Sequence, residues 1–149
     1  MQIKTVEQNK KDFLDLLLLG DEQEDMIDKY LERSELFTLY EDGLKGACTV
    51  TCESKGEYEI KNIAVYPQFQ RCGYGGKLIE YAFSYYAGSI EVMYVGTGDC
   101  PSALGFYKAH GFTESHRIKD FFTNNYAKPI FEGGIQLIDM VYLKRENFG

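Results

Sequence analysis

The sequence has few of the residues that build metal centres or covalent crosslinks. Its 149 residues include four cysteines and two histidines, with no Cys-x-x-Cys pair and no spacing at which the histidines complete a metal-binding pattern. We therefore expect free thiols and no bound metal ion. The cysteines are Cys48, Cys52, Cys72 and Cys100, and the histidines are His110 and His116.

Long apolar runs and clusters of positive charge are also lacking. The longest leucine run, Leu16 to Leu19, is much too short to span a bilayer, and Met1–Lys4 has none of the sections of a secretory signal. The formal net charge is −7, and no run of Lys or Arg would attract nucleic acid or an anionic membrane. We expect a soluble cytoplasmic protein without a membrane or nucleic-acid partner.

The length of the chain suits one domain with its own core, so we expect a single domain over residues 1–149. After a short strand from Gln2 to Thr5, two helices are predicted to open at the capping boxes Thr5-x-x-Gln8 and Asp21-x-x-Glu24. Hydrophobic alternation and turn residues predict the later elements. These are strands over Leu36–Tyr40, Leu44–Cys52 and Tyr58–Val65, a helix ending at Gly88, a strand over Ile90–Val95, a loop over Gly96–Asp99, a helix over Pro101–His110, and strands starting at Phe112 and spanning Ile135–Leu143.

The most informative stretch lies in the middle of the chain, where a strand end is followed by a glycine-rich bend and a helix. A helix begins with about four backbone N–H groups that have no partner within the helix, and its dipole favours an anion there. Gly73, Gly75 and Gly76 leave no Cβ in the way of a phosphate. Arg71 and Lys77 add positive charge. The stretch predicts a phosphate cradle; a plain turn is the alternative.

The spacing Gln70-x-x-Gly73-x-Gly75 resembles the acetyl-CoA loop of the GNAT superfamily of N-acetyltransferases. Two other phosphate motifs fit poorly. The Rossmann pattern belongs after the first strand of a βαβ unit, and the Walker loop requires Ser or Thr after its lysine, where this chain has Leu78. A second segment, Ala103 to Phe112, is similar to the other GNAT signature and keeps its Ala, Phe-Tyr and Gly-Phe positions. The asparagine of that signature falls on Cys100.

The resemblance implies a GNAT-like α/β (α+β) fold: a mixed, mostly antiparallel central sheet of six to seven strands, with about four helices on both faces. It also implies an enzyme that moves the acetyl group of acetyl-CoA, its cosubstrate, directly to a primary amine without a metal. We expect the acceptor to be a small molecule. Two alternatives stay open: a catalytically silent acyl-CoA-sensing or binding module, and a protein or peptide N-acetyltransferase.

The cofactor-binding residues implied by the resemblance belong to the strand end, the loop, the helix start and the second signature. In the family, a backbone N–H of the strand before the loop polarises the acetyl carbonyl, and Val65 is the favoured donor here. The full set is Ile63, Ala64, Val65, Gln70, Arg71, Cys72, Gly73, Tyr74, Gly75, Gly76, Lys77 and Phe106.

Two residues are the candidates for proton transfer. Tyr107 matches the family's acid tyrosine, which protonates the leaving thiolate; the alternative is an aromatic ring packed against the pantetheine arm. Glu59 is the candidate base for the amine. Strand alternation places Glu59, Lys61 and Ile63 on one face. Glu59 could equally be a solvated strand residue or a partner of Lys61.

The acceptor pocket is implied to involve the first two helices and the late strands. The acids of the second predicted helix form either a solvated face or a rim that attracts a cationic substrate. The aromatic segment Phe121–Phe131 could line the pocket or pack against a second copy in a homodimer, and the sequence leaves this open. The acids are Glu22, Glu24, Asp25 and Asp28.

Overall fold

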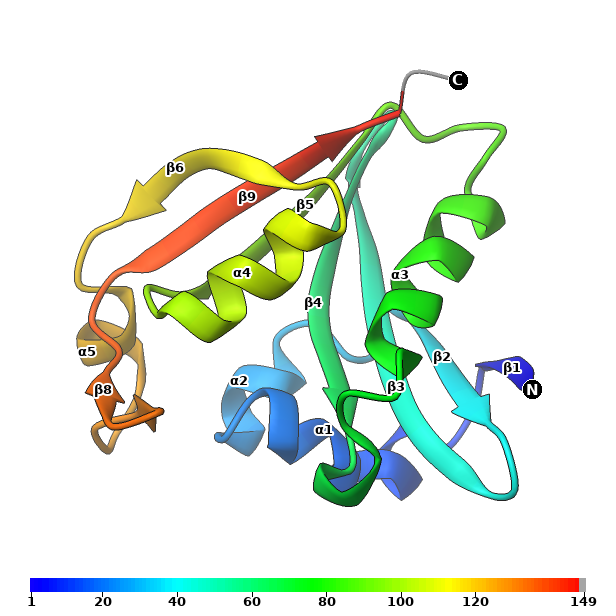
Figure 1. Cartoon of the computed structure of the whole chain (residues 1–149), viewed down its shortest axis with the longest axis horizontal. Helices are drawn as coiled ribbons and strands as arrows, with labels where there is room; N and C mark the ends of the chain where they lie inside the picture. The colour runs from blue at the N-terminus through cyan, green and yellow to red at the C-terminus, as the bar shows by residue number, and fades with distance from the viewer. Residues whose placement is uncertain (148–149) are drawn as a thin grey trace. The chain divides into compact units, whose positions relative to one another are not determined.

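The computed structural model describes residues 1–147 (Figure 1). The chain divides into two compact units, Met1–Ile90 and the part from Glu91 onward, and a single domain remains a prediction. Within residues 1–147, seven longer strands and five α-helices confirm the predicted fold class, although the number of helices exceeds the expected four by one. The strand pairs within each unit are antiparallel.

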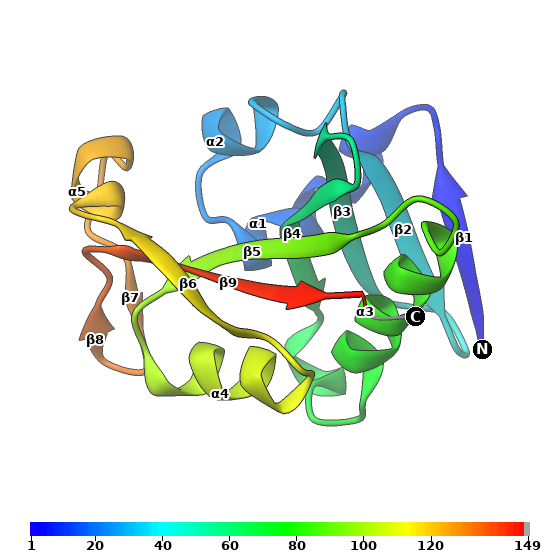
Figure 2. The ribbon, with the colours of Figure 1, turned by 90° about the horizontal axis from the view of Figure 1, so that it is seen from above.

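The first unit is a sheet in the order β1-β2-β3-β4 with helices on both faces (Figure 2). On one face, Leu17 of α1 is fully buried beside Leu36 of β2. On the other, Phe37 packs edge-on against Tyr81 and Tyr85 of α3. Since neighbouring strand residues point to opposite faces, β2 contributes to both cores. The elements are β1 (Gln2–Val6), η1 (Lys10–Phe13, a 3-10 helix), α1 (Leu14–Gly20), α2 (Glu24–Asp28), β2 (Glu35–Tyr40), β3 (Leu44–Ser54), β4 (Glu57–Val65), η2 (Pro67–Phe69, a 3-10 helix) and α3 (Tyr74–Tyr85).

Both predicted capping boxes are wrong. Thr5 lies in β1 opposite Phe37, so its backbone belongs to the sheet and cannot cap a helix. Asp21 follows the end of α1, where its N–H donates to the Leu17 carbonyl at 3.0 Å. α2 begins three residues later, at Glu24. Sheet pairing thus overrides the capping preference of Thr5, whereas the end of α1 holds the backbone of Asp21.

A buried polar network joins α1 to β4. The Asn62 amide nitrogen donates to the Leu17 carbonyl at 2.8 Å and to the Tyr30 hydroxyl oxygen at 3.1 Å. The Tyr30 hydroxyl in turn donates to the Asp21 carboxylate at 3.2 Å. Burial, together with the negative charge of Asp21, raises the pKa of Tyr30. The phenol therefore remains a proton donor and fixes the connection that follows α1.

Replacing Gly20 with alanine is expected to lower the free energy of unfolding by about 1 to 3 kcal/mol, the usual cost of overpacking. A Cβ at Gly20 would lie 2.1 Å from Asn62 Oδ1, and the Asn62 amide cannot withdraw without losing its hydrogen bonds. Urea denaturation measures the change. Gly88→Ala is the control, because a Cβ there meets no atom of residues 1–147 within 4 Å. Equal losses in both variants would contradict the prediction.

The second unit is a sheet in the order β5-β9-β6 with α4 and α5. The predicted loop Gly96–Asp99 is largely strand, since Gly96 pairs with Tyr142 and Gly98 with Met140. A Cβ at Gly98 would lie 2.5 Å from Leu137, so glycine permits this close approach. The elements are β5 (Val92–Gly98), α4 (Pro101–Ala109), β6 (Thr113–Ile118), α5 (Phe121–Asn125), β7 (Phe131–Glu132), β8 (Ile135–Gln136) and β9 (Met140–Glu146).

The predicted strand Ile135–Leu143 is interrupted. Ile135 pairs with Glu132 in the short ribbon β7-β8, and the long strand β9 begins only at Met140. Between them, Leu137 turns into a small core with Cys100 and is 3% exposed. No helix formed by residues 1–147 has the length and apolar character needed to cross a bilayer.

Candidate functional site

The predicted phosphate cradle is the loop between β4 and α3 of the first unit (Figure 1). The backbone is left-handed at Arg71, with φ of 64°, and at Gly73, with φ of 87°. A non-glycine residue in this region costs about 1 to 3 kcal/mol, and such strain often marks a functional loop. α3 begins at Tyr74. The Lys77 N–H already donates to the Gly73 carbonyl at 3.1 Å, so the earlier N–H groups, from Gly73 to Gly76, lack an acceptor within the helix.

The side chain of Gln70 is turned toward the strand end. Its amide nitrogen donates to the Val65 carbonyl at 3.1 Å, and the Cys72 thiol donates to the Gln70 carbonyl at 3.7 Å. Gln70 therefore fixes the loop against β4, and the flanking phosphate contact expected from the sequence stays a prediction. Arg71 and Lys77 are exposed, and the Lys77 ammonium lies 5.7 Å from the centroid of the Tyr74 ring.

The end of β4 offers N–H groups on the edge that faces away from β3. Tyr66 donates its N–H to the Lys45 carbonyl of β3 at 3.1 Å. Because successive N–H groups of a strand point to alternate edges, Ala64 also donates toward β3, whereas Ile63 and Val65 point away. The Ala64 side chain belongs to the core below α1. Of the three predicted residues, Ile63 and Val65 have N–H groups directed away from β3.

A carboxylate lies beside the start of α3, which sequence reasoning did not anticipate. The Tyr74 hydroxyl donates to the Glu41 carboxylate at 2.8 Å. This hydrogen bond lowers the pKa of Glu41, and the positive charges of Lys77 and Lys45 add to the effect. The same contact raises the pKa of Tyr74. Glu41 therefore stays ionised and joins the β2-β3 turn to the cradle helix.

A β-bulge in β4 changes the direction of Glu59. Ile60 and Asn62 pair with consecutive residues of β3, which leaves Lys61 without a partner on that strand. An extra residue of this kind breaks the alternation of faces. The predicted grouping of Glu59 with Lys61 and Ile63 on one face is therefore wrong. Glu59 shares the face of Asn62, below α1.

Glu59 is nearly buried and forms an ion pair. Its Oε2 lies 2.9 Å from Lys61 Nζ, and the two side chains are 11% and 21% exposed. Of the structural alternatives, the partner of Lys61 is the one observed, not the solvated strand residue.

In the second unit, α4 carries Phe106 and Tyr107. The helix begins at Pro101 with Cys100 as its N-cap residue, at the position of the asparagine in the GNAT signature. The thiol of Cys100 does not cap the helix. It is 2% exposed and donates to the Glu132 carboxylate of β7 at 3.3 Å.

The turn that ends α4 fixes Tyr107. The Tyr107 carbonyl accepts hydrogen bonds from the N–H groups of His110 at 3.0 Å and Phe112 at 3.1 Å. Between these two residues, Gly111 adopts the left-handed conformation, with φ of 88°. The Tyr107 ring packs edge-on against Phe112 at 5.8 Å and against Phe106 at 5.1 Å between centroids. With 7% exposure, the ring has little freedom to reorient.

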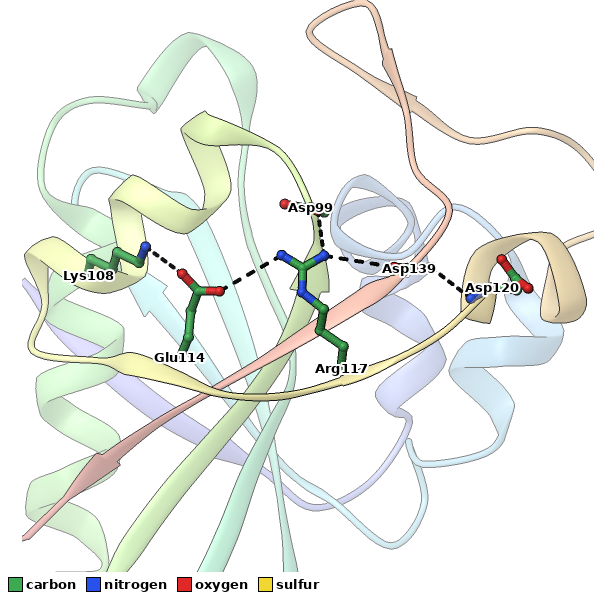
Figure 3. Close-up of polar contacts among 6 residues, drawn as sticks. All are labelled: Asp99, Lys108, Glu114, Arg117, Asp120 and Asp139. Carbon is green, nitrogen blue, oxygen red and sulfur yellow. Dashed lines mark hydrogen bonds and ion pairs between the residues drawn. The ribbon is translucent and has the colours of Figure 1, made fainter.

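A cluster of ion pairs in the second unit surrounds Arg117 of β6 (Figure 3). Its guanidinium lies 2.7 Å from Asp99, 3.8 Å from Asp139 and 3.9 Å from Glu114. Asp139 also accepts the N–H of Asp120 at 2.9 Å. Such exposed pairs are worth about 1 kcal/mol or less each. The cluster joins three segments: the one before α4 through Asp99, the one before α5 through Asp120, and the one before β9 through Asp139. Every member of the cluster already has a partner.

The acids near α2 are partly neutralised. Lys11 Nζ lies 2.5 Å from Glu24 and 2.6 Å from Asp28, whose side chains are about half exposed. This favours a solvated helix face over a substrate-attracting rim, and leaves Glu22 and Asp25 as the acids outside those two pairs. Among residues 1–147, no group of three or more His, Cys, Asp or Glu side chains is arranged to hold a metal ion.

The aromatic segment Phe121–Phe131 forms α5 and leads into the ribbon β7-β8 (Figure 2). Phe122 packs inward with Cys100 and Leu137, whereas Phe131 is 58% exposed. The segment thus contributes to a small core of the second unit. Its part in a substrate pocket or a homodimer interface remains a prediction.

The sequence analysis assigned no role to Lys45 or Asn62, although the sequence around each residue indicates that its polar side chain is buried. Lys45 is the only charged residue in the otherwise uncharged run Leu44–Val50, and it is 8% exposed. Asn62 stands directly before the apolar run Ile63–Val65 of β4 and is 3% exposed. A polar side chain within a buried strand needs partners, so each predicted a specific contact.

Comparison with known proteins tests the resemblance. Residues 32–114 match the family model described as an acetyltransferase (GNAT) domain. A Bacillus subtilis protein named as the uncharacterized N-acetyltransferase YvbK is 38% identical over 96% of this chain and 94% of its own length.

Solved structures agree with that match. A GNAT family acetyltransferase from Elizabethkingia anophelis with acetyl-CoA bound has a TM-score of 0.91 and 33% identity, over 98% of this chain and 97% of that one. A B. subtilis acetyltransferase in complex with CoA has a TM-score of 0.85 and 35% identity, over 99% of both chains. The IAA acetyltransferase from Bacillus cereus has a TM-score of 0.90 and 31% identity, over 98% and 99%. The chain therefore belongs to the GNAT superfamily of N-acetyltransferases, as its two signatures predict.

Proposed function

We propose that this protein transfers the acetyl group of acetyl-CoA to a primary amine of a small molecule. The observation that carries the proposal is the start of α3, where N–H groups without helical acceptors follow two left-handed residues. This backbone suits a diphosphate. The relatives from E. anophelis and B. subtilis were solved with acetyl-CoA and CoA, as their names state, which supports acetyl-CoA as the cosubstrate.

In this proposal, backbone N–H groups make the main contacts with the cofactor, and side chains add charge and support. The N–H groups around Cys72 and from Gly73 to Gly76 hold the diphosphate, with Tyr74 at the helix start. Arg71 and Lys77 supply charge from exposed positions. Gln70 contributes by fixing the Val65 carbonyl, and Phe106 contributes an aromatic contact from α4.

The reaction needs three contributions from the chain. The amine nitrogen attacks the acetyl carbonyl carbon, and the Val65 N–H donates to the oxygen as negative charge develops on it. Glu59, directly or through water, takes the proton that the amine must lose. As the carbon–sulfur bond breaks, the Tyr107 hydroxyl gives a proton to the thiolate, whose ordinary pKa is about 8.5. The products are the acetylated amine and free CoA.

Glu59→Gln is expected to lower kcat/KM by about a hundredfold at neutral pH, the usual size of a general-base effect. The deficit should shrink as the pH approaches the pKa of an alkylamine, about 10, because the free amine then needs no base. Rate–pH profiles measure both. The control is Glu57→Gln, an exposed residue of the same strand whose carboxylate accepts only a surface contact from Ser54 in the described hydrogen bonds. If kcat/KM of Glu59→Gln were lowered equally at every pH, Glu59 would not be the base and would serve only as the ion-pair partner of Lys61.

A two-step assay tests the function itself. Thermal shift with acetyl-CoA, CoA, ATP and NAD should show stabilisation by the two CoA species alone, since binding to the folded state raises the melting temperature. Release of free thiol should then follow with a polyamine or an amino sugar. Stabilisation without thiol release for any amine would favour a sensing module. Release with peptides alone would favour a protein or peptide acceptor.

A further inference from the structure

Lys45 is a buried cation of β3 with a defined set of contacts. It is 8% exposed, its ammonium donates to the Asp42 carbonyl at 2.9 Å, and it lies 3.8 Å from the centroid of the Phe69 ring. No carboxylate of residues 1–147 forms an ion pair with it. An aromatic face and a carbonyl therefore hold the charge, and an attraction of this kind strengthens when water is excluded.

The position of Lys45 follows from an irregularity in the sheet. On β2, Leu39 pairs with Gly46 and Tyr40 with Leu44, so Lys45 has no partner on that strand. The bulge frees its side chain from the regular alternation of faces. It also leaves the Lys45 carbonyl on the β4 side, where it accepts the Tyr66 N–H at 3.1 Å.

Lys45 thus contacts both ends of the segment Tyr66–Phe69, through its carbonyl at Tyr66 and through its ammonium at Phe69. This segment contains η2 and runs directly into Gln70, the first residue of the cradle motif. The ammonium also holds the β2-β3 turn through Asp42. The side chain of Lys45 therefore connects the β2-β3 turn to the approach to the cradle, and its backbone holds the end of β4.

We propose that Lys45 is a positioning residue of the cofactor site, and that its ammonium, held between Phe69 and the Asp42 carbonyl, sets the loop in which the diphosphate binds. The inference rests on the proposed function, because it takes acetyl-CoA as the ligand of the cradle. Lys45 itself does not touch the reacting atoms. Its loss should weaken cofactor binding and spare the chemical step.

The test compares Lys45→Met, Lys45→Arg and Lys55→Met. Methionine keeps the length and the apolar stem but removes the charge, so the Kd and KM for acetyl-CoA should rise about tenfold, with kcat within about twofold. Arginine should restore most of the affinity, because a guanidinium also stacks on aromatic rings and donates to carbonyls. Lys55 is an exposed residue of the β3-β4 turn, and its variant carries the same loss of charge. Isothermal titration and steady-state rates give the two constants.

A double-mutant cycle with Phe69→Leu identifies the route of the effect. If Lys45 acts through the Phe69 ring, Lys45→Met should add little once the ring is gone. Wild-type affinity in Lys45→Met, an equal effect in Lys55→Met, no recovery in Lys45→Arg, or a fall in kcat alone would each overturn the inference while leaving the proposed function standing. Failure of the wild-type protein to bind acetyl-CoA would overturn both.

Discussion

Tyr107→Phe is expected to lower kcat about a hundredfold and to leave the Kd for acetyl-CoA unchanged. The CoA thiolate leaves more readily when an acid of comparable strength gives it a proton, and phenylalanine cannot do so. The substitution keeps the ring that packs against Phe106 and Phe112, and it keeps the backbone contacts of Tyr107 that end α4. The defect should therefore appear in turnover alone. Thiol release at saturating substrates gives kcat, and isothermal titration gives the affinity.

Tyr58→Phe provides the matched control for a lost tyrosine hydroxyl. Tyr58 stacks on Tyr86 at 4.1 Å between centroids, and its hydroxyl shares a hydrogen bond of 2.7 Å with Ser89. Loss of that bond should cost about 1 kcal/mol of stability, with no change in rate. If Tyr107→Phe also turned over at the wild-type rate, water would be the acid. Tyr107 would then be the aromatic residue packed against the pantetheine arm.

The long strands and the apolar helix faces could be predicted because their signals are repeated along the chain. The hairpin β2-β3 occurs where alternation and the turn Glu41–Gly43 indicate it, and Leu78, Ile79 and Ala82 are fully buried as their helical spacing predicts. The prediction of a helix start depends on a single capping residue, and contacts with residues far away in the sequence can place that residue elsewhere. Thr5 lies in the predicted first strand, and its pairing with Phe37 excludes the capping role that its spacing to Gln8 also predicted.

The site was predictable in its main chain and less so in its side chains. Glycine spacing located the left-handed turn at Gly73 and the start of α3, because the demand for a bare backbone is local. The direction of Glu59 depends on a bulge at Lys61, which is a property of the pairing of β3 with β4. The hydrogen bond from Gln70 to the Val65 carbonyl and the contact of the Lys45 ammonium with the Phe69 ring likewise cannot be predicted without the folded structure. Sequence spacing places residues on elements, whereas register decides what they face.

Gly75→Asp is expected to abolish measurable acetyl-CoA binding in a protein that is as stable as the wild type. Gly75 is the second residue of α3, so the new carboxylate would lie against the N–H groups proposed to hold the diphosphate. Two like charges about 4 Å apart repel by about 4 kcal/mol at an effective dielectric constant near 20, which corresponds to about a thousandfold in affinity. An acid in the first turn of a helix is itself favourable by about 0.3 to 1 kcal/mol, so α3 should still form.

Two variants separate the causes of this loss. Gly75→Ala adds the Cβ without the charge, so its affinity should lie between those of the wild type and Gly75→Asp. Gly88→Asp adds the same charge to the chain at an exposed position after α3, and it should bind acetyl-CoA normally. Normal affinity in Gly75→Asp would mean that the diphosphate binds elsewhere. A lowered melting temperature in that variant would contradict the stated cause, because the missing affinity would then reflect a damaged helix and not a repelled phosphate.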